Sequence, residues 1–310
     1  MIAHDIKPNH RTLSRRSLIA FALALAACRG RAKPRDDGKP GKPPQRIASR
    51  TVFADEVLWA LGPAVRARVV GLSPMADDPR YSMVAGEWPK TTPRLGRNPG
   101  ELLALAPDLV ILASFSAAEY RAAIEDKVTV LILDDFTGFD GYLANLERLA
   151  DALDEQDAVA VLRDRFVARR AELEAARPPL DERPTIAAWD HGYSPGSATS
   201  FDDAASSAGF INLPAREGLS GHQRIDAEQL VAWDPEWVVV SCGERSCDQA
   251  IAKFAALPGF AGLTAVTREQ VIAIAPPYLG TTGEGMLDVT ATIQAALLER
   301  QAALLERRRR

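Results

Sequence analysis

Short apolar runs alternate with segments of helical apolar spacing through most of the chain. The runs are apolar throughout, instead of alternating with polar residues, which is typical of parallel strands covered on both faces. They predict strands at 46–50, 68–72, 108–113, 128–133, 185–189, 237–241 and 270–275. Helical spacing falls between them, at 53–61, 99–105, 119–126, 201–208, 227–233, 250–256 and 285–300. Because strand and helix alternate, the pattern predicts an α/β fold.

The alternation is interrupted once, by residues 142–178. Leucines recur there at helical intervals, and no glycine or proline occurs before Pro178. A helix of this length would span about 54 Å at 1.5 Å per residue, enough to cross between two lobes. We therefore expect two Rossmann-like α/β lobes, at 46–141 and 184–300, joined by a single long interlobe α-helix and followed by a basic tail at 301–310.

One pattern occurs in both halves of the chain. The segments NPGELLALAPDLVIL (98–112) and IDAEQLVAWDPEWVVVS (225–241) each place an acidic residue at the start of an apolar helical turn. A proline, a second acidic residue and a run of β-forming residues follow in both. This repetition supports two lobes of similar construction.

The first residues have the composition of an export signal. The basic segment 11–16 precedes an apolar region of 11 residues at 17–27, and a membrane-spanning helix needs about 20 apolar residues. We expect a signal peptide at 1–27. The small residues before Cys28 resemble a bacterial lipobox, in which the cysteine is lipidated; an ordinary signal peptide with an incidental cysteine is the alternative. Residues 28–45 are rich in Lys, Arg, Pro and Gly, which predicts a disordered tether.

Charge and cysteine content agree with export. The net charge of −4 at pH 7 gives no indication of nucleic-acid binding. In an oxidising compartment, Cys242 and Cys247 are expected to form a disulfide. A metal site with C-x4-C spacing is the alternative, but two further ligands are missing nearby.

The order of short motifs resembles a known family. The motifs are Arg46-Ile-Ala-Ser49, Glu56-x-Leu58-x-Ala60-Leu61-Gly62, Val69-Val70-Gly71, Pro93-x-Leu95-Gly96, Pro107-Asp108-Leu109-Val110, Ala208-Gly209-x-x-Asn212, Gly218-x-x-Gly221 and Glu228-x-Leu230 before Pro235. Their order, from Arg46 to about Leu298, is similar to that of periplasmic substrate-binding proteins that serve ABC importers for cobalamin, ferric siderophores and haem.

The resemblance implies a clamp of two lobes with limited hinge motion and a small-molecule metal chelate held in the cleft. It implies a monomer without chemistry or a cofactor of its own. Its partners would be an ABC permease and ATPase at the inner membrane. The location would be the periplasm or cell envelope, with a lipid anchor at Cys28.

In this family, a glutamate on each lobe docks onto arginines of the permease, which charge-assisted pairing with guanidinium groups explains. Glu228 has the family spacing to Pro235, whereas Gly100 occupies the corresponding position of the first lobe and Glu101 comes one residue later. One helical residue is a turn of about 100°, so Glu101 is expected to point aside. The alternative is that both glutamates only favour helix N-termini through the dipole.

Ligands of open α/β sheets meet the loops at the carboxyl ends of the strands. Aromatic rings there suit a large flat ligand, arginines suit carboxylate, catecholate or hydroxamate oxygens, and Tyr or His suits haem iron. These loops hold the candidate ligand-binding residues Arg50, Tyr81, Trp88, Arg97, Phe115, Phe136, His191, Tyr193, His222 and Tyr278. For each residue, packing or solvation is the alternative role.

Two other functions remain open from the sequence. A bare transition-metal ion could be held by His191 and His222 with the adjacent Asp190. An exported hydrolase could use Ser220 and His222, although the chain lacks the G-x-S-x-G, H-E-x-x-H and phosphate-loop motifs. A tethered scaffold or sensor domain is a third alternative.

Overall fold

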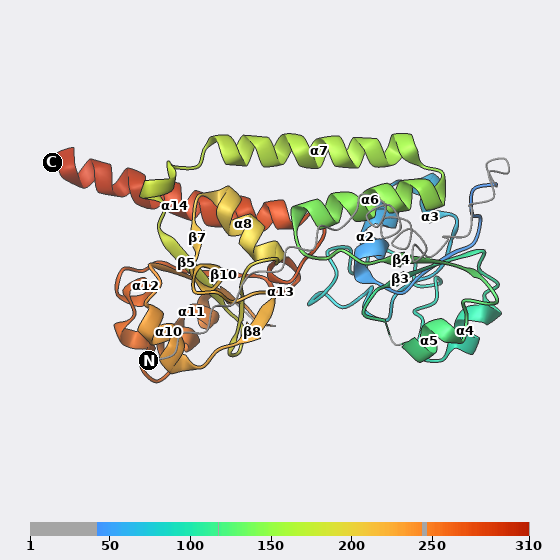
Figure 1. Ribbon diagram of the computed structural model, residues 1–310, viewed down its shortest axis with the longest axis horizontal. Coiled ribbons are helices and arrows are strands. Elements are labelled where there is room, and N and C mark those ends of the chain that lie inside the picture. The colour runs from blue at the N-terminus through green and yellow to red at the C-terminus, as the bar shows by residue number, and fades with distance from the viewer. Residues whose placement is uncertain (1–41, 117, 244–246, 310) are drawn as a thin grey trace, which may run out of the picture. The chain divides into compact units, whose positions relative to one another are not determined.

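The computed structural model describes residues 42–116, 118–243 and 247–309. The expected signal peptide, Cys28 and nearly all of the expected tether lie outside the described residues. Residues Pro43–Arg310 form one compact unit, which holds two α/β lobes and the helices between them (Figure 1). The predicted α/β fold with two lobes is therefore confirmed.

The N-terminal lobe is built on a parallel sheet of strand order β2-β1-β3-β4. Its strands are β1 (Ile47–Ser49), β2 (Val69–Gly71), β3 (Leu109–Ala113) and β4 (Thr129–Leu133). Its helices are α2 (Val52–Ala60), α3 (Pro63–Arg66), α4 (Pro99–Ala104) and α5 (Ala118–Ala122). In the register of the sheet, Ile47 lies opposite Leu109 on one side and Val69 on the other.

The C-terminal lobe repeats this plan with a parallel sheet of order β10-β9-β5-β7. Its strands are β5 (Thr185–Trp189), β7 (Ile211–Asn212), β9 (Trp237–Ser241) and β10 (Val271–Ile274). A second, antiparallel sheet pairs β6 (Tyr193–Pro195) with β8 (His222–Arg224). The helical elements are η1 (Leu180–Glu182), α8 (Ser200–Ala208), α9 (Leu213–Arg216), α10 (Ala227–Trp233), α11 (Cys247–Ala255), η2 (Phe260–Gly262), α12 (Thr264–Thr267), α13 (Pro276–Leu279) and α14 (Met286–Arg309).

Each parallel sheet has a hydrophobic core on both faces. In the first lobe, Ile47 and Ile111 belong to one core, whereas Val110 and Leu112 belong to the core on the opposite face. Successive side chains of a strand point to opposite faces, so a strand covered on both sides must be apolar at every position. This double burial explains why the strand sequences show no alternation.

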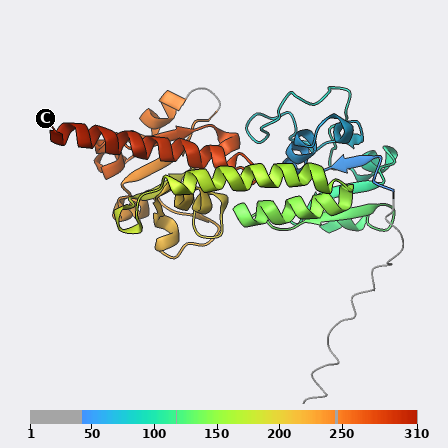
Figure 2. The ribbon, with the colours of Figure 1, turned by 90° about the horizontal axis from the view of Figure 1, so that it is seen from above.

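The linker differs from the single helix expected over 142–178, and that prediction is wrong in its boundaries. The segment holds two helices, α6 (Phe139–Leu153) and α7 (Gln156–Ala175). Asp154 ends α6 in a left-handed conformation, with φ 57° and ψ 48°, which aspartate tolerates better than most residues do. The two helices pack side by side (Figures 1 and 2).

Of these two helices, only α7 runs from one lobe to the other. Its 20 residues span about 30 Å, and it contacts α6 as well as α8 and α14 of the C-terminal lobe. The fold therefore keeps one long interlobe helix, but this helix is shorter than expected and starts at Gln156. None of the helices in the described part of the chain is long and apolar enough to cross a membrane.

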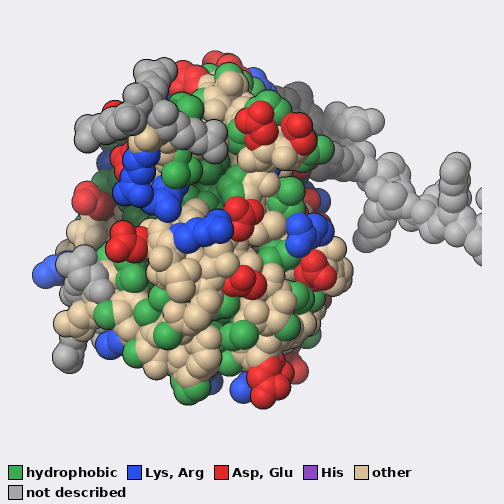
Figure 3. All heavy atoms as spheres, turned by 90° about the vertical axis from the view of Figure 1, so that its left-hand side faces the viewer, with side chains coloured by type: hydrophobic (Ala, Val, Ile, Leu, Met, Phe, Trp, Pro, Cys, Tyr) green, Lys and Arg blue, Asp and Glu red, His purple; other side chains and the backbone are tan. Residues whose placement is uncertain are grey.

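Helix α14 also connects the lobes. Met286 and Leu287, in its first turn, belong to the core of the N-terminal lobe, whereas Val289, Ile293 and Leu297 belong to a core of the C-terminal lobe. The helix continues to Arg309, so the basic segment 301–310 is helical as far as it is described. On the face shown in Figure 3, acidic and basic side chains are interspersed among apolar ones.

Candidate functional site

Two neighbouring cavities are lined by both lobes, and we call them together the cleft. The first, of about 380 Å³, is lined mainly by the N-terminal lobe and by 280–282 of the other lobe; we call it the aromatic cavity. The second, of about 400 Å³, is lined mainly by the C-terminal lobe and by Arg80 and Tyr81. We call it the Tyr–His cavity. Tyr81 and Gly280 border both, so the two cavities adjoin each other.

Phenylalanines form a wall of the aromatic cavity. The rings of Phe53 and Phe136 meet edge to face at 5.8 Å, and Phe115 lies 5.3 Å from Phe136. Phe115 is 77% exposed, so a large apolar ring faces solvent next to an apolar cavity. An exposed apolar surface of this kind indicates a binding site, and the wall suits a flat, apolar ligand face.

The second cavity gathers oxygen and nitrogen donors from both lobes. Tyr81 is 51% exposed and comes from the N-terminal lobe, whereas Tyr193 and His222 come from β6 and β8. Pairing of β6 with β8 places Pro195 opposite His222, which fixes the backbone position of His222 at the cavity. Desolvation lowers the pKa of His222, against a smaller opposite effect of Asp190, so the imidazole is neutral at pH 7 and free to bind a metal centre.

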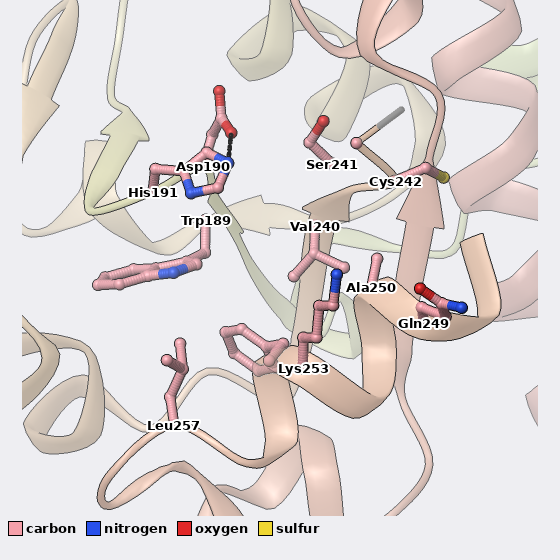
Figure 4. Close-up of a pocket in the computed structure, with 12 residues that line it drawn as sticks. Trp189, Asp190, His191, Val240, Ser241, Cys242, Gln249, Ala250, Lys253 and Leu257 are labelled. Carbon is pink, nitrogen blue, oxygen red and sulfur yellow. Dashed lines mark ion pairs between the residues drawn. The ribbon is translucent and has the colours of Figure 1, made fainter. Parts of the chain in front are cut away.

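A third cavity, of about 460 Å³, lies in the C-terminal lobe and shares Asp190 and His191 with the Tyr–His cavity. Figure 4 shows Trp189, Val240 and Leu257 around it, with Lys253 among them. His191 Nε2 lies 3.9 Å from Asp190 Oδ1. The cavity is at the carboxyl ends of β5 and β9, where ligands of α/β sheets bind.

A disulfide closes the neighbouring loop. Cys242, which lines the third cavity, is bonded to Cys247 at the start of α11. The bond ties the end of β9 to the helix that carries Lys253, and so holds one wall of the cavity in place.

The two arginines expected to bind ligand lie together in a fourth cavity, of about 460 Å³, in the N-terminal lobe. The Arg50 guanidinium stacks on the Tyr120 ring at 4.0 Å and donates to the Gly96 carbonyl. Arg50 also lines the aromatic cavity, whereas Arg97 does not reach the cleft. Arg97 therefore lines a cavity beside the cleft, and Arg50 lies between the two because it lines both.

Two of the expected ligand residues lie elsewhere. Trp88 is only 3% exposed and packs in the core with its ring 5.1 Å from that of Trp59. Tyr278 packs against the core of the C-terminal lobe and lines a separate cavity beside α14. Their loops were identified from the sequence, but which way each ring turns depends on packing, and neither ring is among the residues that line the cleft.

Two acids near the cleft were missed as site residues. Asp55 is 0% exposed and accepts a hydrogen bond of 2.5 Å from Ser73 Oγ, and burial raises its pKa to about 6. Glu56 lines the aromatic cavity and accepts a hydrogen bond of 2.8 Å from the Met83 amide. Desolvation and then the charge of Asp55 raise the pKa of Glu56 to about 7, against the effect of that amide. The sequence pattern that could have identified them is the pair of adjacent acidic residues within the apolar helical segment FADEVLWAL.

The two expected docking glutamates are exposed in the first turns of α4 and α10. Other residues cap both helices: Asn98 accepts from the Gly100 amide, and Asp226 from the Gln229 amide. Figure 1 shows α4 and α10 each at the end of its lobe away from α7. The Glu101 carboxylate folds back over Gly96, where a Cβ would come within 2.7 Å of its Oε2. The Glu101 carboxylate therefore lies against the backbone of Gly96.

The alternative sites find less support in the described residues. Within them, no group of three or more His, Cys, Asp and Glu side chains is arranged to hold a metal ion. Ser220 does not line the cavity that contains His222, so the nucleophile expected for a hydrolase does not face the cleft.

Comparison with known proteins places these observations in context. A family model described as periplasmic binding protein matches residues 47–278. Among curated proteins, none matches the sequence. Similar solved structures include a possible iron-binding (periplasmic solute-binding) protein of Staphylococcus epidermidis, at 17% identity and TM-score 0.70, covering 83% of this chain and 99% of that one.

Two further structures have named ligands. A periplasmic heme-binding protein of Pseudomonas aeruginosa is 24% identical, with TM-score 0.66 over 82% of this chain and 92% of that one. A periplasmic vitamin B12-binding protein of Vibrio cholerae is 21% identical, with TM-score 0.64 over 84% of this chain and 98% of that one. At these identities, the likeness establishes the fold alone.

Proposed function

Because this chain belongs to the periplasmic binding protein family, we propose that it captures an iron complex (a ferric siderophore or haem) or a cobalamin-like corrinoid between its lobes for an ABC importer. The family consists of extracytoplasmic binding proteins and not of enzymes, so the described site needs to hold a solute and release it. Membership of the family is shown by the matching family model, whereas the identity of the solute and its delivery to an importer are proposed.

The observation that carries the proposal is that the aromatic cavity adjoins the Tyr–His cavity, with Tyr81 and Gly280 lining both. One side offers stacked phenylalanine rings to a flat macrocycle or an apolar chelate. The other side offers phenol and imidazole groups from opposite lobes. Tyr81 and His222 are the proposed ligands of a bound iron or cobalt centre, because phenolate and imidazole are common axial ligands of such centres.

The remaining parts of the proposal concern partners. Glu228, and to a smaller extent Glu101, would pair with arginines of a permease, and an ATPase would drive transport. A lipid on Cys28 would anchor a monomer to the cell envelope through the segment 28–45.

The test is a binding panel of haemin, cyanocobalamin, a ferric hydroxamate and a ferric catecholate. Quenching of tryptophan fluorescence reports binding, since Trp189 lines a cavity that adjoins the cleft; equilibrium dialysis with metal analysis gives the stoichiometry. We expect one ligand class to bind at one per chain and to be recovered unchanged. Binding of none of the four refutes the proposal, and conversion of the ligand would favour an enzyme.

A further inference from the structure

Glu56 places one carboxyl group in an otherwise mostly apolar cavity. It lines the aromatic cavity together with Phe53, Phe136 and Met75. The opposite lobe approaches it closely: a Cβ added at Gly283 would lie 3.0 Å from Glu56 Oε2. The carboxyl group is therefore at the junction of the two lobes, on the surface that a ligand must cover.

Only one of its oxygens is engaged within the described residues. Oε1 accepts the hydrogen bond from the Met83 amide, and no donor is bonded to Oε2. Oε2 lies next to Gly283, and Glu56 itself lines the cavity. A ligand that fills the cavity is thus the available partner for Oε2.

The groups around Glu56 do not neutralise a negative charge. Asp55 precedes it on α2 and raises its pKa electrostatically, and the charge of Glu56 in turn raises the pKa of Tyr142 of α6. Glu284, near the same tyrosine, is paired with Arg165 of α7. Elsewhere on the cavity wall, the titratable groups are Tyr81 and Arg50, and the latter is held by the Gly96 carbonyl.

An ionised carboxylate in an apolar cavity is costly, and removal of water makes it more so. In the ligand-free protein, the pKa of Glu56 is already about 7, chiefly through desolvation. A ligand that fills the cavity displaces the remaining water and raises the pKa further. The protonated carboxyl then carries an O–H that needs an acceptor.

We propose that Glu56 is a ligand-contacting residue that takes up one proton from solvent as the ligand enters and donates a hydrogen bond from Oε2 to an oxygen of the ligand. This inference rests on the proposed function and narrows it. The ligand would be neutral or anionic and would present a carbonyl, hydroxamate or carboxylate oxygen to the N-terminal lobe. A cationic group at this place would instead keep Glu56 ionised.

Calorimetry tests the inference with the panel ligand that binds. Titrations in buffers of different ionisation enthalpy are expected to show uptake of about one proton at pH 8. The affinity is expected to rise by up to tenfold per pH unit as the pH falls from 8 to 7, the limit for one linked proton. Glu56→Gln keeps an uncharged donor, so it should bind with little pH dependence and no linked proton, whereas Glu125→Gln, on the exposed surface, should behave as the wild type.

Any proton that the ligand, His222 or Tyr81 takes up or releases on binding does so in both proteins. The decisive quantity is therefore the difference in proton uptake and in pH dependence of affinity between wild type and Glu56→Gln. Equal pH slopes, or affinity that weakens as the pH falls in the wild type alone, would overturn the inference and leave the proposed function intact. Proton uptake by the wild type is measured without any variant. Absence of binding by every panel member would instead refute the proposed function, and this inference with it.

Discussion

Burial distinguishes aromatic residues that looked equivalent in the sequence. Trp88 is enclosed by the core and its Nε1 lacks a hydrogen-bond partner within the described residues, whereas Phe115 stands out into solvent beside the cleft. The first contributes to stability. The second gains most of its contacts when a ligand arrives.

The two rings should therefore respond differently to mutation. Phe115→Ala is expected to weaken binding of the panel ligand by about ten- to a hundredfold, because covering a phenylalanine is worth about 1.5–3 kcal/mol, and to leave unfolding nearly unchanged. Trp88→Phe should leave the affinity unchanged and alter the free energy of unfolding by less than about 1.5 kcal/mol. Fluorescence titration and urea denaturation measure both. A loss of affinity in Trp88→Phe, without a loss in Phe115→Ala, would show that Trp88 takes part in ligand binding.

The raised pKa of Glu56 also makes stability depend on pH. The folded protein holds this proton up to about pH 7, whereas an unfolded glutamate releases it near its ordinary pKa of about 4.3. The stabilisation is complete below the unfolded pKa and is lost as the pH rises through 7. Urea denaturation should show that the advantage of wild type over Glu56→Gln shrinks by up to ~3 kcal/mol between pH 4.5 and pH 8. An advantage that stays constant or grows would show that the folded pKa is not raised.

The sequence identified the loops that carry the site better than the individual side chains. Loops at strand ends are predictable because apolar runs locate the strands. Arg50, Tyr81, Phe115, Phe136, His191, Tyr193 and His222 do line the cleft. The turning of Trp88 into the core and the exposure of Glu56 to the cavity depend on contacts between residues distant in sequence, which no local pattern records.

At the scale of elements, the break between α6 and α7 depends on one backbone conformation. Asp154 is exposed and left-handed, and none of its side-chain atoms makes a hydrogen bond within the described residues. Asp234 ends α10 in the same conformation, but its carboxylate accepts bonds of 2.7 Å from both the amide and the hydroxyl of Thr264. The two aspartates thus share a backbone conformation and differ in whether the side chain is hydrogen-bonded, so they can be compared directly.

Replacing each aspartate with glycine distinguishes the contribution of backbone strain to stability from that of the side-chain hydrogen bonds. Asp154→Gly should raise the free energy of unfolding by about 0.5 kcal/mol, since relief of the left-handed strain exceeds the added entropy of the unfolded chain. Asp234→Gly should lower it by about 1–2 kcal/mol through the lost bonds to Thr264. Urea denaturation measures both. Clear destabilisation by Asp154→Gly would mean that α6 and α7 do not meet at a left-handed residue.

Buried elements were easier to predict from the sequence than exposed ones. Strands covered on both faces gave apolar runs and were found. Strands β6, β7 and β8 were missed because they are only two or three residues long and, in β8, exposed at every residue, so no hydrophobic pattern marks them. The helix break was missed because neither glycine nor proline marks it, and an aspartate within a polar stretch is equally consistent with a continuous helix.

For the whole molecule, docking to a membrane partner is the function most open to test. Because Asn98 and Asp226 already cap α4 and α10, the neighbouring glutamates are available for other contacts. Glu228→Lys should reduce uptake of the solute, measured with the cognate permease in proteoliposomes, at least tenfold, since it sets like charges against each other. Glu101→Lys should reduce it less, because that carboxylate folds back over Gly96.

Glu125→Lys, on the exposed surface of the same lobe as Glu101, serves as the control. Binding of the solute in solution should be unchanged in all three variants. Equal losses of uptake for Glu101 and Glu228, or no loss for either, would contradict a docking face centred on Glu228.

The place of Met286 and Leu287 in the core of the N-terminal lobe sets an order of events during synthesis. Domains usually fold as units while the chain is still being made. Here the first lobe lacks two core side chains until the ribosome has passed residue 287, long after its own sheet has been translated. Neither core is complete before the first turns of α14 have been made, so a nascent protein stays incompletely folded up to that point, and we expect the finished one to lose both lobes in a single cooperative transition.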